Sequence, residues 1–166
     1  MNIVLTGFMG SGKTIVGKLL AKKINYMFVD LDDWIVEQEK KSINEIFAEH
    51  GEKYFRDVET CMVKRAANMD NLVIAAGGGV VLREENMNEL EKKSKIIYLN
   101  VDPETVYERL KEDSTRPLLK VDNPMQKIKE LLNSRELFYK RNHFALDTTR
   151  LTPIEVVSKI QEFLNV

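Results

Sequence analysis

A glycine-rich motif near the N-terminus constrains the fold of this chain more than any other feature. Residues 7–14 read Gly-Phe-Met-Gly-Ser-Gly-Lys-Thr, a complete G-x-x-x-x-G-K-T pattern. An apolar run at residues 3–5 precedes the motif, and apolar residues at helical spacing follow it: Ile15, Leu19, Leu20 and Ile24. A strand, a tight loop and a helix in this order direct backbone N–H groups and the helix dipole at one anion. The motif therefore predicts a phosphate-binding loop, and we call residues 7–14 the phosphate loop.

The residue types within the phosphate loop match the parts of a nucleoside triphosphate with its metal ion. Lys13 would reach the β- and γ-phosphates, and the Thr14 hydroxyl would ligate Mg²⁺. The alternative is a glycine-rich turn with a surface lysine, but the strand and helix that the motif requires both flank it. The nucleotide-binding residues expected from the loop are Gly10, Ser11, Gly12, Lys13, Thr14 and Ile15.

Short apolar runs alternate with helical patterns along the rest of the chain. The runs occupy residues 27–29, 72–75, 96–99 and 144–146, and they are rich in β-branched or aromatic residues without clean alternation. Strands that are buried on both faces of a parallel sheet have this composition. The pattern predicts a single three-layer α/β/α domain with a central five-stranded parallel sheet, in which ligands bind beyond the carboxyl ends of the strands.

Several helix boundaries are marked by capping residues. Residues 42–45 read Ser-Ile-Asn-Glu, which is a capping box, and Gly51 follows where that helix is expected to end. Asp102 precedes Pro103 in the manner of an N-cap before a proline at the first helical position. Pro153 begins the last predicted helix in the same way.

Composition excludes several classes of protein. The 166 residues are 43% hydrophobic and 31% charged with a net charge of −1, which is globular and gives no global field for nucleic acid or an anionic membrane. The one cysteine, Cys61, fits a reducing compartment and is expected to be a small core residue. The sequence shows neither a secretory leader nor an apolar run long enough to cross a membrane, so we expect a cytoplasmic protein.

Acidic residues follow the second apolar run, where residues 30–33 read Asp-Leu-Asp-Asp. Aspartates commonly cap helices, and a helix is expected here, so capping alone explains them about as well as catalysis does. Beside a phosphate loop, however, phosphoryl transfer needs one carboxylate near the metal and another near the attacking hydroxyl. Asp30 and Asp32 are the candidates for these two roles, and Asp33 is the expected cap.

Three consecutive glycines, Gly77, Gly78 and Gly79, follow the third run. We call them the glycine loop. Either they form a tight turn, or another molecule lies against their backbone.

Four arginines are candidates for binding carboxylate or phosphate, although each could instead be a solvated surface charge: Arg56, Arg109, Arg116 and Arg135. The polar segment 111–123 lies between two predicted helices and is long enough to form a lid over the site.

Together these segments resemble the shikimate kinase family, within the nucleoside-monophosphate-kinase type of P-loop proteins. The resemblance covers nearly the whole chain. It rests on the phosphate loop, Asp-x-Asp at 30–32, Phe55-Arg56 with Glu59, the glycine loop, Arg-Pro-Leu-Leu at 116–119, and Arg135 four residues before Tyr139. The sequence departs from the family pattern at Leu31, where Ser or Thr is frequent, and beyond Asp147, so Arg150 receives no role.

The resemblance implies that ATP phosphorylates the 3-hydroxyl of shikimate, in the pathway to chorismate and the aromatic amino acids. Lys13, Asp32 and Arg116 would be catalytic, with Asp32 orienting or deprotonating the reacting hydroxyl. Asp30 would act near Mg²⁺ through water, together with Thr14, and Arg109 would lie against adenine. Shikimate would be held by Asp32, Arg56, Arg135 and the glycine loop.

The resemblance also implies a layout for the domain, in which the substrate binds a helical segment at about 31–62 and the lid spans about 111–123. We expect a monomer that takes shikimate and ATP and binds neither nucleic acid nor membrane. Alternatives are a kinase for another small acid such as gluconate, a nucleoside-monophosphate kinase, and a non-catalytic P-loop module. The last would be indicated by loss of Lys13 or Asp32, and both residues are present.

Overall fold

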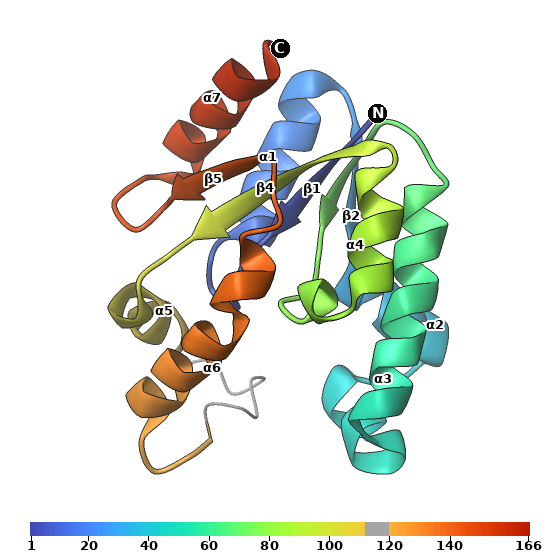
Figure 1. Cartoon of the computed structure of the whole chain (residues 1–166), viewed down its shortest axis with the longest axis vertical. Coiled ribbons are helices and arrows are strands. Elements are labelled where there is room, and N and C mark those ends of the chain that lie inside the picture. Colours follow the sequence, from blue (N-terminus) through green and yellow to red (C-terminus); the bar gives the residue numbers. More distant parts are fainter. Residues whose placement is uncertain (112–119) are drawn as a thin grey trace.

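The computed structural model describes residues 1–111 and 120–166, and these form a parallel sheet of five strands covered by helices on both faces (Figure 1). The strands are β1 (Asn2–Thr6), β2 (Met27–Asp30), β3 (Leu72–Ala75), β4 (Ser94–Asn100) and β5 (Phe144–Asp147). Their order across the sheet is β2-β3-β1-β4-β5, and every pairing is parallel. The predicted fold class and all five predicted strands are confirmed.

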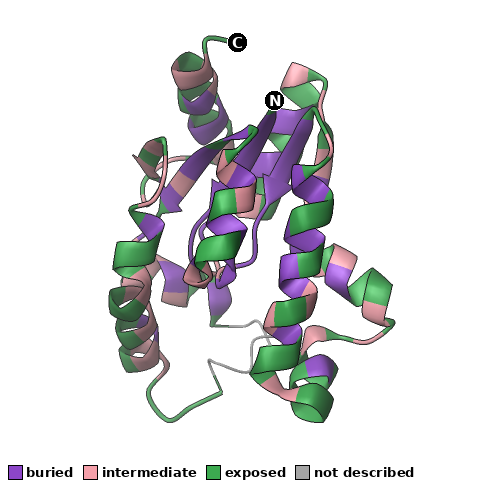
Figure 2. Cartoon of the chain, turned by 45° about the vertical axis from the view of Figure 1, so that its right-hand side comes forward, coloured by how far each residue is buried: buried purple, intermediate pink, exposed green. Residues whose placement is uncertain are grey.

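Side chains of the central strand β1 point alternately to the two faces of the sheet, as a pleated backbone requires. Ile3 and Leu5 belong to a core beneath α1 (Lys13–Ile24) and α7 (Pro153–Leu164). Val4 belongs to the opposite core, which is built with residues of α2 (Leu31–Glu39), α3 (Ile43–Ala67) and α4 (Glu84–Glu91). Figure 2 shows that the strands are mostly buried, whereas the outward helix faces are exposed.

The remaining helices, α5 (Pro103–Leu110) and α6 (Pro124–Tyr139), pack together beyond the ends of the strands. In Figure 1 they lie at the lower left, and α2 with the beginning of α3 lies at the lower right. A third apolar cluster joins them to the phosphate loop and consists of Phe8, Val101, Val106, Leu110 and Ile128. No helix in the described part of the chain combines the length and apolarity needed to cross a bilayer.

The capping signals of the sequence are largely confirmed. Ser42 and Glu45 form the predicted capping box, and Asp102 caps α5 by accepting a hydrogen bond from the Thr105 N–H. The expectation for Asp33 is wrong, because Asp30 caps α2 and Asp33 lies inside its first turn. Strand β2 passes directly into α2 at Asp30, which leaves no loop for a later cap.

Two further expectations on α3 need correction. Gly51 does interrupt the helix, with φ 81° and ψ 176°, but helical residues resume at once, so that α3 extends to Ala67 with a kink. Cys61 is exposed and is not a core residue.

Candidate active site

A cavity of about 650 Å³ lies at the carboxyl ends of β1, β2 and β3. Residues from the phosphate loop, the Asp-x-Asp segment, α3, the glycine loop and α6 line it together. Of the predicted site residues, the lining includes Gly10, Gly12, Lys13, Thr14, Ile15, Asp30, Asp32, Arg56, Gly77, Gly78, Gly79 and Arg135. The fold therefore brings these five separate stretches of sequence to one cavity, as expected at the ligand-binding edge of a parallel sheet.

The phosphate loop passes directly from β1 into α1. Gly12 is the N-cap of α1 with φ 94° and ψ 12°, a left-handed conformation that is strained for residues with a Cβ. Lys13 folds back over the loop, and its Nζ donates hydrogen bonds to the carbonyl oxygens of Gly7 (2.8 Å) and Phe8 (2.9 Å). The predicted site residue Ser11, which is part of the loop, is buried. The ammonium group thus lies where the phosphates of a nucleotide would be cradled.

Thr14 and Asp30 are in direct contact. Thr14 Oγ1 donates a hydrogen bond of 2.8 Å to Asp30 Oδ2, while Asp30 Oδ1 accepts one of 3.1 Å from the Asp32 N–H. Mg²⁺ prefers oxygen ligands, and in such sites it binds one or two protein side chains, substrate phosphates and several waters. A hydroxyl and a carboxylate side by side next to a phosphate loop supply the protein ligands of this kind. The two residues therefore fit a Mg²⁺ site. Burial raises the pKa of the neighbouring Asp33 above its ordinary value, and the charge of Asp30 raises it further.

Asp32 lies in the first turn of α2, where the helix dipole stabilises a carboxylate. Its Oδ1 approaches Gly77 so closely that a Cβ on this glycine would lie 2.8 Å from it. The same Cβ would lie 3.1 Å from Oε1 of Glu59, so Asp32 and Glu59 converge on Gly77. Two carboxylates consequently face the start of the glycine loop.

Arg56 lies between these carboxylates and the end of the glycine loop. Its Nη1 donates hydrogen bonds to both carboxylate oxygens of Glu59, at 2.9 and 3.1 Å, and the Glu59 side chain is only 1% exposed. The guanidinium lies directly on Gly79, where any Cβ would collide with it at 2.3 Å. Burial raises the pKa of Glu59 above its ordinary value, although the charge of Arg56 acts in the opposite direction.

Arg135 approaches the glycine loop from α6. Its Nη1 would lie 3.5 Å from a Cβ on Gly78, and its guanidinium lies over the Phe8 ring at 5.8 Å from the centroid. One turn along α6, the Tyr139 hydroxyl donates a hydrogen bond of 2.7 Å to the carbonyl oxygen of Gly78. Burial raises the pKa of Tyr139 to about 12, so its hydroxyl remains a donor at neutral pH.

The remaining predicted residues lie at the nucleotide side or outside the described residues. Arg109 Nη1 donates a hydrogen bond of 2.8 Å to the carbonyl oxygen of Gly10, so this guanidinium lies across the phosphate loop. Arg116 lies outside the described residues, and of the predicted lid only Lys111 and residues 120–123 are described.

Three residues around the site received no role from the sequence. Glu59 is signalled only by its spacing of three from Arg56, and Tyr139 only by its spacing of four from Arg135. Arg83, which contacts the backbone of Arg56, carries no such signal because 27 residues separate the two.

Comparison with known proteins identifies the family. The family model for shikimate kinase matches residues 9–165. A shikimate kinase of Thermodesulfovibrio yellowstonii is 50% identical over 159 residues, which cover 96% of this chain and 92% of the relative.

Solved structures agree with this match. A shikimate kinase from Acinetobacter baumannii, solved in complex with shikimate, aligns with a TM-score of 0.94 at 35% identity and covers 99% of this chain and 93% of that one. A deoxyadenosine kinase from M. mycoides with bound dATP aligns at 19% identity with a TM-score of 0.67 and covers 100% of this chain and 100% of that one, which shows a likeness of fold alone. The chain thus has the nucleoside-monophosphate-kinase type of P-loop fold, and it is an enzyme that belongs to the shikimate kinase family.

Proposed function

We propose that this chain transfers the γ-phosphoryl group of ATP to the 3-hydroxyl of shikimate, giving shikimate 3-phosphate and ADP in the pathway to chorismate and the aromatic amino acids. The observation that carries the proposal is the shared cavity. In it a phosphate loop faces Asp32, Arg56, Arg135 and the glycine loop, which together offer a carboxylate for a hydroxyl and two guanidinium groups for an anionic substrate.

On the substrate side, Asp32 is the residue that receives the reacting hydroxyl. A carboxylate held in the first turn of a helix and directed at the cavity can orient that hydroxyl and accept its proton. Arg56 and Arg135 bind the carboxylate of shikimate, and the glycine loop lets the substrate approach the backbone between them. We refer to Arg56 and Arg135 as the carboxylate clamp.

On the nucleotide side, Gly10, Ser11, Gly12 and Ile15 contribute backbone to the phosphate site, and Lys13 moves from the loop carbonyls onto the β- and γ-phosphates. Thr14 and Asp30 are the residues that would hold Mg²⁺, with Asp30 acting through water. Bound Mg²⁺ supplies positive charge that neutralises the phosphate oxygens. Arg109 lies beside the adenine.

The remaining expectations of the sequence belong to this proposal as well. The helical segment 31–62 is the substrate-binding region of one domain, and segment 111–123 is a lid that brings Arg116 to the phosphates. The enzyme acts as a cytoplasmic monomer, a state that light scattering on the purified chain would measure.

An assay of ADP release tests the function directly. With Mg²⁺ and ATP present, shikimate is expected to stimulate ADP release strongly, whereas gluconate and AMP are expected to leave it near the rate in water. Equal stimulation by gluconate or AMP, or none by shikimate, would contradict the proposal.

A further inference from the structure

The N-cap position of α4 is occupied by Arg83. N-cap positions favour short side chains that accept hydrogen bonds from the first turn, such as Ser, Thr, Asp or Asn. Arginine has no side-chain acceptor, and within the described part of the chain the Arg83 side chain makes no capping hydrogen bond to α4. The local needs of the helix therefore do not account for an arginine at this position.

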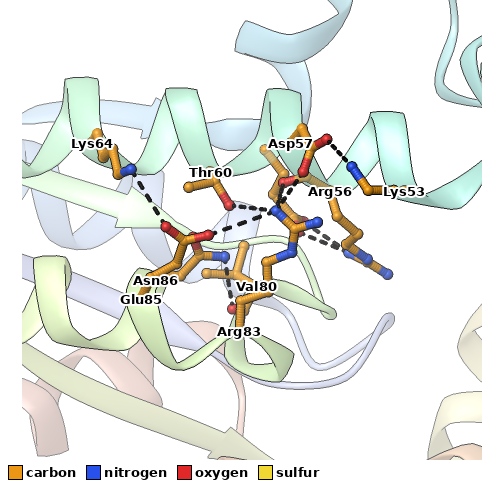
Figure 3. Close-up of polar contacts among 10 residues, drawn as sticks. Lys53, Arg56, Asp57, Thr60, Lys64, Val80, Arg83, Glu85 and Asn86 are labelled. Carbon is orange, nitrogen blue, oxygen red and sulfur yellow. Dashed lines mark hydrogen bonds and ion pairs between the residues drawn. The ribbon is translucent and has the colours of Figure 1, made fainter.

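The side chain of Arg83 lies against α3, and its Nη1 is also 3.8 Å from Glu85 Oε1 of its own helix (Figure 3). A single nitrogen, Nη1, lies 2.8 Å from Asp57 Oδ1, 3.1 Å from the carbonyl oxygen of Arg56 and 3.3 Å from Thr60 Oγ1. All three acceptors belong to one turn of α3, the turn that carries the Arg56 side chain. The Arg83 side chain is 26% exposed, so these contacts are partly shielded from water.

The same short stretch of chain contacts Arg56 at two points. At Gly79 it lies against the Arg56 guanidinium, and four residues later Arg83 binds the Arg56 main chain. Between these points the stretch is held in shape, because the Val80 N–H donates to the Gly77 carbonyl at 3.1 Å and the Leu82 N–H donates to the Gly79 carbonyl at 3.1 Å. The buried amide of Asn86 adds a hydrogen bond of 3.0 Å to the Val80 carbonyl.

A rigid segment that contacts both the side chain and the main chain of one residue fixes where that side chain can lie. If the contact at Arg83 were lost, the glycine loop could shift relative to α3, and the Arg56 guanidinium would no longer keep its position over Gly79. We propose that Arg83 is a positioning residue for the carboxylate clamp, holding the backbone of Arg56 at a fixed distance from the glycine loop. This inference rests on the function proposed above, because it assumes that Arg56 binds the substrate.

The electrostatic setting agrees with this role. The hydrogen bond from Arg83 lowers the pKa of Asp57 below its ordinary value, with a further contribution from Lys53 at 3.1 Å. Asp57 therefore stays charged at neutral pH and continues to bind the Arg83 guanidinium. The contact persists under the conditions in which the kinase would work.

Steady-state kinetics of Arg83→Gln test the inference. The KM for shikimate is expected to rise about tenfold, the effect of losing one hydrogen bond to a charged group, while the KM for ATP and the thermal midpoint change little. Arg83→Lys should restore most of the affinity, since all three contacts are made by one nitrogen and an ammonium group has three donors. Loss of shikimate affinity without rescue by lysine, or an equal rise in both KM values, would overturn the proposal.

Lys64→Gln is the matched control. Lys64 also links α3 to α4, but its ammonium pairs with Glu85 at 3.4 Å in an exposed position rather than binding the turn that carries Arg56 (Figure 3). This variant should leave both KM values unchanged. If it raises the KM for shikimate as much as Arg83→Gln does, the effect belongs to helix docking in general and the positioning role is wrong.

Two further variants complete the design. Asp57→Asn changes a half-exposed side chain and should fold even if Arg83→Gln does not, and it should raise the KM for shikimate in the same direction by a smaller factor. If Arg83→Gln does not fold, and Asp57→Asn folds but leaves the KM for shikimate unchanged, the proposal is overturned.

Arg56→Ala separates the positioning role from the clamp on which it rests. Unchanged shikimate affinity in Arg56→Ala contradicts both the clamp and the positioning role, whereas weakened affinity there with none in Arg83→Gln contradicts the positioning role alone.

Discussion

Tyr139 and Gly78 are joined by a hydrogen bond of 2.7 Å from the phenol hydroxyl to the glycine carbonyl, across 61 residues of sequence. The Tyr139 ring stacks on Tyr98 with centroids 4.9 Å apart and planes 7° apart, so a partly buried partner on β4 helps to hold the hydroxyl in place. This bond fixes the orientation of a peptide in the glycine loop from the helix that also carries Arg135. It therefore connects the two sides of the substrate cavity.

Replacing Tyr139 by phenylalanine removes this hydrogen bond and keeps the stacked ring. The KM for shikimate should rise by a factor of about 3 to 10, as for the loss of one neutral hydrogen bond, with the KM for ATP unchanged. Tyr98→Phe is the control, because the Tyr98 hydroxyl donates instead to Asn100 at 3.0 Å in an exposed position. Identical kinetics for Tyr139→Phe and the wild type would show that the glycine loop keeps its shape without the tyrosine.

Asp32→Asn should remove most of the turnover and leave ATP binding nearly intact. A positioned acid–base group contributes about 100- to 10 000-fold to rate, and the lost interaction is made to the reacting hydroxyl. Turnover is measured by ADP release, and nucleotide affinity by titration with ATP. A loss of less than about tenfold would mean that the carboxylate does not act on the hydroxyl.

Arg135→Ala and Arg56→Ala should each weaken shikimate binding by about 2–5 kcal/mol, the range for removing one side of a buried charge pair. Calorimetric titration of shikimate into each variant measures this loss. ATP affinity serves as the internal control, because neither side chain belongs to the phosphate loop. The clamp assignment fails if both variants bind shikimate as the wild type does.

Asp30→Asn should raise the Mg²⁺ concentration needed for half-maximal activity. Asparagine is as good an N-cap as aspartate, so α2 should keep its start while the site loses a charged oxygen donor. Asp33→Asn is the matched control, since the Thr14 hydroxyl donates its hydrogen bond to Asp30. A Mg²⁺ titration of activity that is shifted equally in both variants would argue against a specific role for Asp30.

Glu59 gives a prediction about stability and pH. Its pKa in the folded protein is raised above the ordinary value of 4.5, so the folded state binds more protons than the unfolded state above that pH. The contribution of Glu59 to the free energy of unfolding therefore falls as pH rises from 4.5 through the folded pKa. Glu59→Gln removes this dependence, and its stability relative to the wild type should increase across that window. Denaturant titrations of both proteins at several pH values measure the difference, and parallel curves would contradict the raised pKa.

The sequence was sufficient to predict the elements whose determinants are local. Strand composition, the Ser42 capping box and the glycines of the phosphate loop depend on neighbouring residues, and the structure agrees with each. Cys61 shows how a local prediction fails. The buried face of α3 follows Glu59, Met62, Val63 and Ala66 at helical spacing, and this register turns Cys61 outward although cysteines are usually buried.

The motif residues of the site were predictable, but the contacts that hold them were not. Asp32, Arg56 and Arg135 could be chosen because their types and spacing suit the chemistry. The contact of Arg83 with Arg56 and that of Tyr139 with Gly78 depend on how helices from distant parts of the chain dock together. The spacing of residues within one segment does not predict such contacts between distant segments.

The position of β1 at the centre of the sheet has a consequence for how the enzyme moves. Its amides and carbonyls pair with both β3 and β4, and its side chains enter both apolar cores, so it can open only when the whole domain unfolds. In hydrogen–deuterium exchange, the amides of Val4 and Leu5 should therefore be among the slowest in the chain. Strand β2 lies at the sheet edge and pairs with β3 alone, so its amides should exchange faster than those of β1. The phosphate loop and the Asp-x-Asp segment should therefore follow strands of different local stability.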